Sequence, residues 1–252
     1  MRINSNADML NNLRTLQESR DKMKSSMEKL SSGQKINRAS DDPAGLIISE
    51  KMRSQIATIE QKLENIEMTN NKLTTAEGNL DTLQNSLLEM RNTALAAANE
   101  GGNSEEAQDT YQQSFNDAAK GYNTTRENAA FGSQKLLDGS SGSAADIKPL
   151  DNIDVSTAEK AQAAVALIDE KINEIAATRS EIGSMQKNDL TSSRNNLQTE
   201  LLNLTASEST VRDTDMAREY TTMVTAEMQV KAGIAMLAQQ KQAPNLVMNF
   251  LR

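Results

Sequence analysis

Residues 43–99 read PAGLIISEKMRSQIATIEQKLENIEMTNNKLTTAEGNLDTLQNSLLEMRNTALAAAN, and their pattern indicates a single long helix. No proline interrupts it after Pro43, and its apolar residues recur every three or four positions, as on one face of an α-helix. The apolar stripe comprises Ile56, Ile59, Leu63, Ile66, Leu73, Leu80, Leu83, Leu87 and Met90. A helix over 43–99 is roughly 80 Å long at 1.5 Å per residue. We therefore expect an elongated, all-α molecule.

The start of this long helix is marked by Asp42-Pro43. Asp42 can cap the free N–H groups of the first turn, and Pro43 suits the first helical position. Gly33 is a typical residue at the end of a preceding helix. The segment from Gln34 to Asp41 between these signals is therefore expected to be a polar linker.

Both ends of the chain carry heptad patterns. The first comprises Met9, Leu13, Leu16, Met23, Met27 and Leu30, with Arg20 in the remaining position. The last comprises Met216, Tyr220, Met223, Val230, Ile234 and Leu237, with Glu227 in the stripe. An apolar tail follows, formed by Leu246, Val247, Phe250 and Leu251. We expect the two ends to pair as an antiparallel coiled coil. Their stripes are either the core of a monomeric bundle or a seam buried only on association.

The middle of the chain alternates between helical and irregular patterns. A break at 101–104 precedes a shorter helix over about 105–130, and 133–156 is expected to be a loop with at most one small hairpin. Helical spacing then resumes, but Leu190 follows Ile182 by eight residues, one more than a heptad. The extra residue predicts local overwinding, a bulge or a slip. A second polar linker is expected over 207–214.

Composition excludes several classes of function. The chain has no Cys and no His, so disulfides are excluded, a zinc site is not expected, and the commonest general base is missing. A net charge of −8 argues against nucleic-acid binding. No apolar run reaches the ~20 residues that span a bilayer. Residues 1–5 include no apolar segment, so we expect no cleavable secretory signal. Together, the composition and the lack of a long apolar run lead us to expect no membrane partner, no cofactor and no catalysis.

Two separate stretches resemble the bacterial flagellin family. Residues 30–56 read LSSGQKINRASDDPAGLIISEKMRSQI and resemble its N-terminal signature. Residues 207–252 read SESTVRDTDMAREYTTMVTAEMQVKAGIAMLAQQKQAPNLVMNFLR and resemble its C-terminal signature. The resemblance covers about 1–132 and 157–252, and it implies a structural subunit that polymerises into the flagellar filament for motility.

The resemblance also implies a domain plan. Residues 1–33 and 213–252 correspond to an inner-tube domain, and 34–42 and 207–212 to spoke linkers. Residues 43–206 correspond to a surrounding helical rod domain, with the short loop 133–156 where larger flagellins insert outer domains. The spoke and turn residues are Asn37, Arg38, Asp41, Asp42 and Pro43. The first four either contact neighbouring subunits or act locally, and the local role of Asp42 is that of a helix cap.

The partners implied by the resemblance are other copies of the chain, an export chaperone on 216–252, the export apparatus, and hook-associated and cap proteins. The implied location is extracellular, in the flagellum, after export through the flagellar channel. The family has a stretch recognised by a vertebrate innate immune receptor. Here Met90 and Arg91 match it, whereas Glu89 stands where Arg is usual and Thr93 where Leu is usual. Because glutamate reverses the charge of that contact, we expect weak receptor activation.

Three other classes of protein compete with this interpretation. A hook–filament junction protein shares the terminal helices and a similar Asp-Asp-Pro turn. However, the sequence of residues 37–56 and that of the C-terminal end resemble flagellin more than they resemble a junction protein. A signalling coiled coil normally continues from a membrane segment, and no apolar run in this sequence is long enough to be one. An enzyme needs a nucleophile with a base, or a metal site, and no such spacing occurs.

Overall fold

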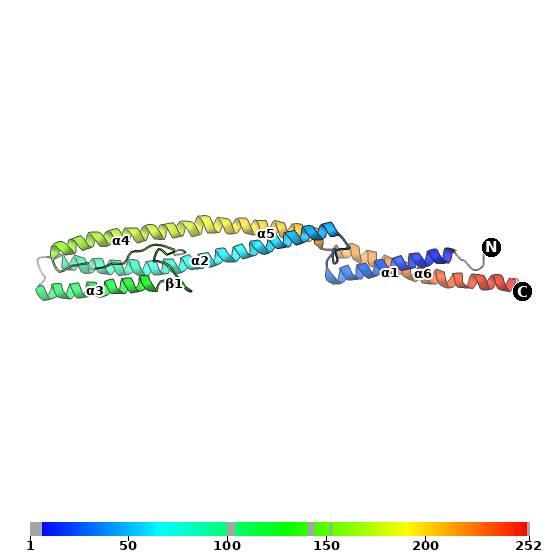
Figure 1. Ribbon diagram of the computed structural model, residues 1–252, viewed down its shortest axis with the longest axis horizontal. Helices are drawn as coiled ribbons and strands as arrows, with labels where there is room; N and C mark the ends of the chain where they lie inside the picture. Colours follow the sequence, from blue (N-terminus) through cyan, green and yellow to red (C-terminus); the bar gives the residue numbers. More distant parts are fainter. Residues whose placement is uncertain (1–6, 100–103, 141–143, 152, 251–252) are drawn as a thin grey trace. The chain divides into compact units, whose positions relative to one another are not determined.

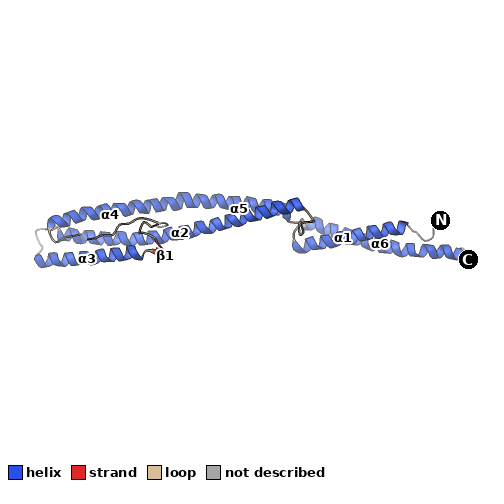
Figure 2. Cartoon of the chain, in the orientation of Figure 1, coloured by secondary structure: helices blue, strands red, loops and turns tan. Residues whose placement is uncertain are grey.

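The computed structural model describes residues 7–99, 104–140, 144–151 and 153–250, and the chain is almost entirely helical (Figure 1). The elements are α1 (Ala7–Ser32), α2 (Pro43–Ala97), α3 (Glu105–Asn128), β1 (Ala130–Phe131), β2 (Gln134–Lys135), α4 (Ala158–Ser184), the π-helical turn η1 (Met185–Leu190), α5 (Thr191–Arg212) and α6 (Met216–Phe250). Figure 2 shows how little strand accompanies these helices. The predicted all-α fold is confirmed. None of the described helices combines the length and apolarity needed to cross a membrane.

The long helix α2 begins where the sequence predicts. The backbone N–H of Gly45 donates to Asp42 Oδ1 at 2.9 Å, and the N–H of Leu46 donates to the Asp42 carbonyl at 3.0 Å. Asp42 is therefore the helix cap and Pro43 is the first helical residue. The helix has 55 residues and ends at Ala97, slightly before the predicted Asn99.

The chain packs as two compact units. The first contains residues 1–58 and 200–252, and the second contains 59–199. Helices α2 and α5 contribute residues to both units. These packing units follow contacts within one chain. The predicted inner-tube, spoke and rod boundaries refer to layers of a filament, and they stay a prediction.

In the first unit, α1 and α6 lie side by side and run antiparallel (Figure 1). Two side-chain hydrogen bonds show the direction: Ser26 Oγ donates to Glu219 Oε1 at 2.6 Å, and Ser19 Oγ donates to Gln229 Oε1 at 3.3 Å. A step toward the N-terminus of α1 thus corresponds to a step toward the C-terminus of α6. The expected pairing of the two ends is confirmed.

The second unit holds the main core. Helices α2, α3 and α4 bury apolar side chains against each other, and the largest of these are Tyr122 and Phe115 from α3. The predicted stripe of α2 lies in this core from Leu73 onward. The core residues of α2 and α4 include Leu73, Leu80, Leu83, Leu87, Met90, Ile168, Ile175 and Ile182.

The connection between α3 and α4 is held against the core by side-chain amides of α3. Asn123 Nδ2 donates to the Leu150 carbonyl at 2.8 Å, and Asn123 Oδ1 accepts from the Leu150 N–H at 2.9 Å. Gln112 similarly donates to the Ile153 carbonyl and accepts from the Val155 N–H. The apolar residues of the connection are therefore anchored inward. The buried ones are Leu136, Leu137, Ile147, Leu150 and Val155.

The predicted small hairpin exists, but it starts earlier than the expected loop. Ala130 pairs with Lys135 and Phe131 pairs with Gln134, so the hairpin begins before residue 133. Gly132 has a φ of 62°, a left-handed conformation that glycine adopts without a steric penalty. The two strands are too short to carry a periodicity of two, which explains the misplaced boundary.

The turn η1 explains the irregular spacing before Leu190. The N–H of Thr191 donates to the Gln186 carbonyl, five residues back instead of four. The π turn is a bulge that absorbs the extra residue, so Ile182 is buried and Leu190 still packs against the same core. Of the predicted overwinding, bulge or slip, the structure contains the bulge.

The end of α5 corrects one prediction. Residues 207–212 were expected to begin a polar linker, but they continue the helix to Arg212. The segment has no glycine or proline. Its hydroxyl groups bond within the helix, since Ser207 Oγ donates to the Asn203 carbonyl and Thr210 Oγ1 to the Ala206 carbonyl. Polarity alone therefore did not break the helix, and only 213–215 separate α5 from α6.

Candidate assembly surface

The predicted seam of α1 splits into two columns. The inward column faces α6 and consists of Met9, Leu16, Met23 and Leu30, which are buried or half-buried. Leu13 and Met27 belong to the other column and are 43% and 48% exposed. Since Leu13 precedes Leu16 by three residues, the two columns are about 60° apart around the helix. The α1–α6 pair therefore covers only part of the predicted seam.

Helix α6 repeats this division. Its inward column consists of Met223, Val230 and Leu237, all half-buried. Tyr220 and Ile234 form the outward column and are 59% and 47% exposed. Met216, at the start of the helix, is also exposed. Both terminal helices thus keep large apolar side chains in contact with solvent in a single chain.

Small residues complete the contact between α1 and α6, and the sequence analysis missed them. Ser19 and Ser26 of α1 and Ala226 and Gly233 of α6 are buried. A Cβ at Gly233 would lie 3.3 Å from Leu16 Cδ1, so the helices approach closely here. A signal for these positions was available, because each helix places its two small residues seven positions apart.

The apolar tail lies outside this description. Helix α6 continues to Phe250, but the side chains of Leu246, Val247 and Phe250, and the whole of Leu251, are not among the described residues. Their predicted role in assembly stays a prediction.

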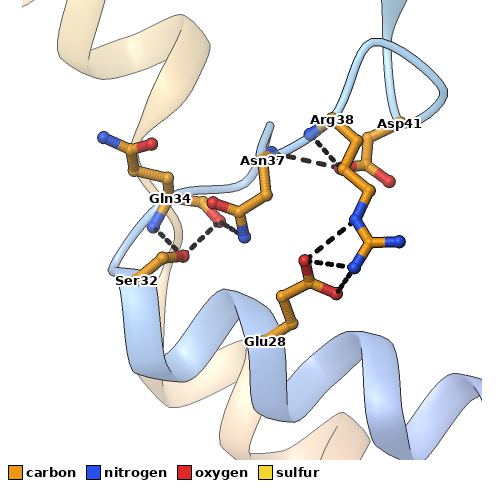
Figure 3. Close-up of polar contacts among 6 residues, drawn as sticks. All are labelled: Glu28, Ser32, Gln34, Asn37, Arg38 and Asp41. Atoms are coloured by element: carbon orange, nitrogen blue, oxygen red, sulfur yellow. Dashed lines mark hydrogen bonds and ion pairs between the residues drawn. The ribbon is translucent and has the colours of Figure 1, made fainter.

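The connection between α1 and α2 has its own polar network (Figure 3). Asp41 Oδ2 accepts from the N–H of Arg38 at 2.9 Å and from the N–H of Asn37 at 3.1 Å. These two hydrogen bonds, that of Arg38 first, hold the pKa of the Asp41 carboxyl below its usual value. The Arg38 guanidinium in turn donates to both carboxylate oxygens of Glu28, at 3.0 and 3.1 Å. In a single chain, these predicted spoke residues therefore act locally.

The two connections of the first unit are joined by backbone hydrogen bonds. Gln34 and Asp213 form an antiparallel bridge. Beside it, the Lys35 N–H donates to the Arg212 carbonyl at 2.6 Å, and the Thr214 N–H donates to the Gly33 carbonyl at 3.0 Å. The chain therefore leaves α1 and returns to α6 at one place.

An ion pair supports this junction. Arg212 Nη1 lies 2.9 Å from Glu50 Oε1, and Arg53 Nη1 lies at the same distance from that oxygen. The hydrogen bonds from Arg212 and then Arg53 lower the pKa of Glu50. The pair ties the end of α5 to the start of α2.

The stretch with the receptor-like pattern lies in the core unit, on α2. Met90 is fully buried, and Arg91 Nε lies 2.6 Å from Asp169 Oδ1 of α4. Glu89 is exposed, and Thr93 bonds to the Glu89 carbonyl through its hydroxyl. Of the two residues that match the family pattern, one is inaccessible and the other is paired within the chain.

Metal chemistry has no evident site in the described part of the chain. Within those ranges, no group of three or more Asp and Glu side chains is arranged to hold a metal ion. The features that stand out are instead the exposed apolar columns of α1 and α6, which suit association.

Comparison with known proteins agrees with these features. A family model described as the bacterial flagellin N-terminal helical region matches residues 3–142, and one described as the bacterial flagellin C-terminal helical region matches 165–251. The flagellin of Halalkalibacterium halodurans is 35% identical over 100% of both chains. The flagellin of Bacillus subtilis is 32% identical over 100% of both chains. The flagellar filament 33 kDa core protein of Treponema phagedenis is 29% identical, again over 100% of both.

A crystal structure of Bacillus cereus flagellin aligns with 53% of this chain and 88% of that chain, at a TM-score of 0.46 and 20% identity. The two family models and the full-length relatives show the family. The chain belongs to the bacterial flagellin family, whose members are structural filament proteins and not enzymes.

Proposed function

We propose that α1 and α6 make the contacts between subunits of the bacterial flagellar filament, in which this flagellin-family chain is a structural subunit. The main support is the outward column of each terminal helix. Leu13, Met27, Tyr220 and Ile234 have the spacing of a buried seam but stay exposed in one chain. Apolar surface of this kind marks an interaction site. A contact repeated from copy to copy without closing a ring gives an open helical polymer.

We further propose the layer plan implied by the family. Residues 1–33 and 213–252 form the inner tube, and 43–206 form the surrounding layer. The joined connections support a spoke role for 34–42, because the network of Arg38, Asp41 and Glu28 gives that segment a fixed local structure. Since 207–212 are helical, the return spoke is short and consists of the end of α5 and residues 213–215.

The first experiment is negative-stain electron microscopy of the purified chain after salt-induced assembly. Long uniform filaments are expected from the full chain, and none from a version that lacks 216–252. Failure of the full chain to polymerise would contradict the proposal. Growth only on a preformed hook would instead indicate a hook–filament junction protein.

Because the truncated chain loses the helix that pairs with α1, a gentler variant is also needed. Ile234→Ser replaces an exposed side chain, so the circular dichroism of the free chain should not change. Polymerisation should weaken because apolar area is lost from the subunit contact. Leu88→Ser, on an exposed position of α2 in the other unit, is the matched control and should assemble normally. Equal polymerisation of both variants would show that the outward column is not part of the contact between subunits.

The proposed partners in export and growth are an export chaperone, the export apparatus, and hook-associated and cap proteins, with the final location outside the cell in the flagellum. The exposed Met216, Met228 and Met236 support a chaperone site on α6, because flexible apolar side chains adapt to a partner. Removal of 216–252 should abolish co-purification with the chaperone. Retained binding would place that site elsewhere.

We propose that activation of the vertebrate innate immune receptor is weak. Burial of Met90, pairing of Arg91 with Asp169 and the negative charge of Glu89 support this. In a reporter-cell assay, Glu89→Arg combined with Thr93→Leu should raise potency above that of the unmodified chain. Potency of the unmodified chain equal to that of a strong flagellin agonist would contradict the proposal.

A further inference from the structure

The α1–α6 pair has two unlike flanks. We name as the apolar flank the two outward columns, Leu13, Arg20 and Met27 of α1 with Tyr220, Glu227 and Ile234 of α6. The hollow flank contains two adjoining hollows of about 250 and 280 Å³, both lined by Lys22 and Gln229. The outward apolar columns therefore lie on one flank, and empty volume lies on the other, where Met236 is an exposed apolar residue of the lining.

Helical geometry places these flanks on opposite sides of the pair. At about 100° per residue, Leu13 is rotated about 60° to one side of Leu16, and Thr15 about 100° to the other side. The same offsets separate Tyr220 and Thr222 from Met223. Thr15 and Thr222 both line the hollows, which shows that the two helices present the hollow flank on the same side.

The hollow flank is empty because its residues are small. Between the longer side chains of Lys22 and Gln229, the lining includes Thr225 and Ala226 in the smaller hollow. In the larger hollow, Ser19, Ala232 and Gly233 lie between Leu16 and Met236. Side chains of this size leave room for larger ones from elsewhere. Leucine, isoleucine and tyrosine, which occupy the apolar flank, are of that larger kind.

Each flank carries one cation and one anion. The apolar flank carries one cation, Arg20, and one anion, Glu227. The hollow flank carries Glu18 and Lys22 at its edge. Within the described residues, Lys22, Glu18 and Arg20 take part in none of the chain's ion pairs, whereas Glu227 is paired only with Lys231, one turn along α6. Each flank can thus offer the other a partner for its charges.

We propose that the apolar flank of one copy of this chain docks into the hollow flank of the next copy. This inference rests on the proposed function and specifies the contact through which subunits associate. Two different surfaces are used, so each docked copy still presents a free apolar flank and a free hollow flank. Such a head-to-tail contact extends without limit, whereas packing of apolar flank on apolar flank stops at a dimer.

The absence of cysteine allows a clean cross-linking test. Three single-cysteine chains are made: Ile234→Cys on the apolar flank, Thr225→Cys on the hollow flank, and Ala235→Cys as a control on an exposed position beside Ile234. Pairs of these chains are co-assembled with unmodified chain, so that no variant has to polymerise alone. The filaments are then treated with a short bis-maleimide and analysed by mass spectrometry.

The expected product is a mixed dimer, in which the cysteine at position 234 of one chain is cross-linked to the cysteine at position 225 of another chain. The control position 235 should give at least about tenfold less of the mixed dimer. Dimers joined through position 234 in both chains, without the mixed product, would overturn the inference in favour of apolar-on-apolar packing. Intact filaments without either product would also overturn it while leaving the proposed function in place. Failure of the unmodified chain to form filaments would overturn both.

A filled hollow gives an independent readout. Ala232→Trp adds a large side chain to the hollow flank, and Ala235→Trp adds the same side chain one residue away from Ile234. The critical concentration for assembly should rise about tenfold or more for Ala232→Trp relative to Ala235→Trp, with unchanged circular dichroism of the free chains. Equal critical concentrations would show that the hollows stay empty in the filament and would overturn the inference.

Discussion

Gly45, in the first turn of α2, lies where a side chain has no room. A Cβ at this position would lie 2.8 Å from Ile36 Cδ1 and would collide with the Asp42 carboxylate. Ile36 is itself fully buried. Gly45→Ala should therefore lower the free energy of unfolding of the first unit by about 1–3 kcal/mol, the usual cost of overpacking. Urea denaturation followed by circular dichroism measures this.

Gly78 provides the matched control for that substitution. It lies in the same helix, and a Cβ there would meet nothing within 4 Å. Gly78→Ala should stabilise the chain by about 0.5–1 kcal/mol, because alanine loses less backbone entropy in a helix. The argument about Gly45 fails if both alanine variants gain stability.

Tyr122 is fully buried, and its hydroxyl has no hydrogen-bond partner among the described residues. Burial, with the nearby charge of Glu174, raises its pKa to about 12. A buried hydroxyl without a partner costs about 1–3 kcal/mol, so Tyr122→Phe should keep or increase the free energy of unfolding at pH 7. A clear loss of stability would mean that the hydroxyl has a partner.

The same tyrosine sets a dependence on alkaline pH. The folded pKa of about 12 exceeds the unfolded value of 10.0, so the folded state holds this proton more tightly. Its contribution to stability is complete below pH 10 and is lost as the pH rises through about 12. Absorbance titration of the phenolates should show a late component in the unmodified chain that is lost in Tyr122→Phe. A late component that persists in Tyr122→Phe would contradict this assignment.

At the scale of elements, η1 is an insertion that the helix tolerates. Deletion of Lys187, an exposed residue of η1, should turn the π turn into α-helix and keep Ile182 and Leu190 facing the core. The melting temperature should stay the same or rise. Deletion of Glu170 from the regular part of α4 should instead rotate one side of the helix by about 100° and pull Ile168 or Ile175 out of the core. A similar loss of stability in both deletions would contradict the bulge account.

The terminal helices should open more readily than the core helices in the free chain. Among the described residues of α1, those classed as buried are Leu16, Ser19 and Ser26, whereas α2 buries an apolar stripe from Leu73 to Ala97. Local opening is easier where fewer apolar contacts are lost. Hydrogen exchange should therefore be fast over 9–30 in the monomer and slow in filaments. Full protection of 9–30 in the monomer would contradict a seam completed by other copies.

Most helices were predictable because their signals are local. The cap at Asp42, the glycine at 33 and the heptads of α2 and α4 need only neighbouring residues to be recognised. The spacing from Ile182 to Leu190 even indicated the site of η1. The continuation of α5 through Ser207 and Thr210 was not predictable from polarity, since those hydroxyls bond to the helix itself. The backbone bridge between Gln34 and Asp213 depends on residues far apart in the chain, and no local pattern encodes it.

At the scale of the whole molecule, the net charge of −8 opposes association of identical copies. Added salt shortens the screening length from about 30 Å at 0.01 M to about 8 Å at 0.15 M. The lag before assembly should therefore shorten as NaCl increases over this range. Light scattering measures the lag, and sucrose at matched osmolarity is the control. A lag that lengthens with salt would mean that attraction between charges on different copies dominates.

The assembly surface was only partly predictable at this scale. The heptads of α1 and α6 include both the residues that pair the two helices and those that stay exposed, but a stripe does not reveal which of its columns faces the partner helix of the same chain. That choice depends on Ser19, Ser26, Ala226 and Gly233, whose small size brings the inward columns together. Hydrophobicity patterns give no weight to such residues, so the exposed column emerged only from the structure.

The bridge between Gln34 and Asp213 has a consequence for engineering. Its Cα atoms are about 5 Å apart, as across any antiparallel bridge, so everything between these residues is an insert with adjacent ends. A foreign domain whose termini are equally close could replace residues 35–212 without altering the path of α1 and α6. The terminal helices would then serve as a scaffold for displaying cargo at regular intervals along a fibre.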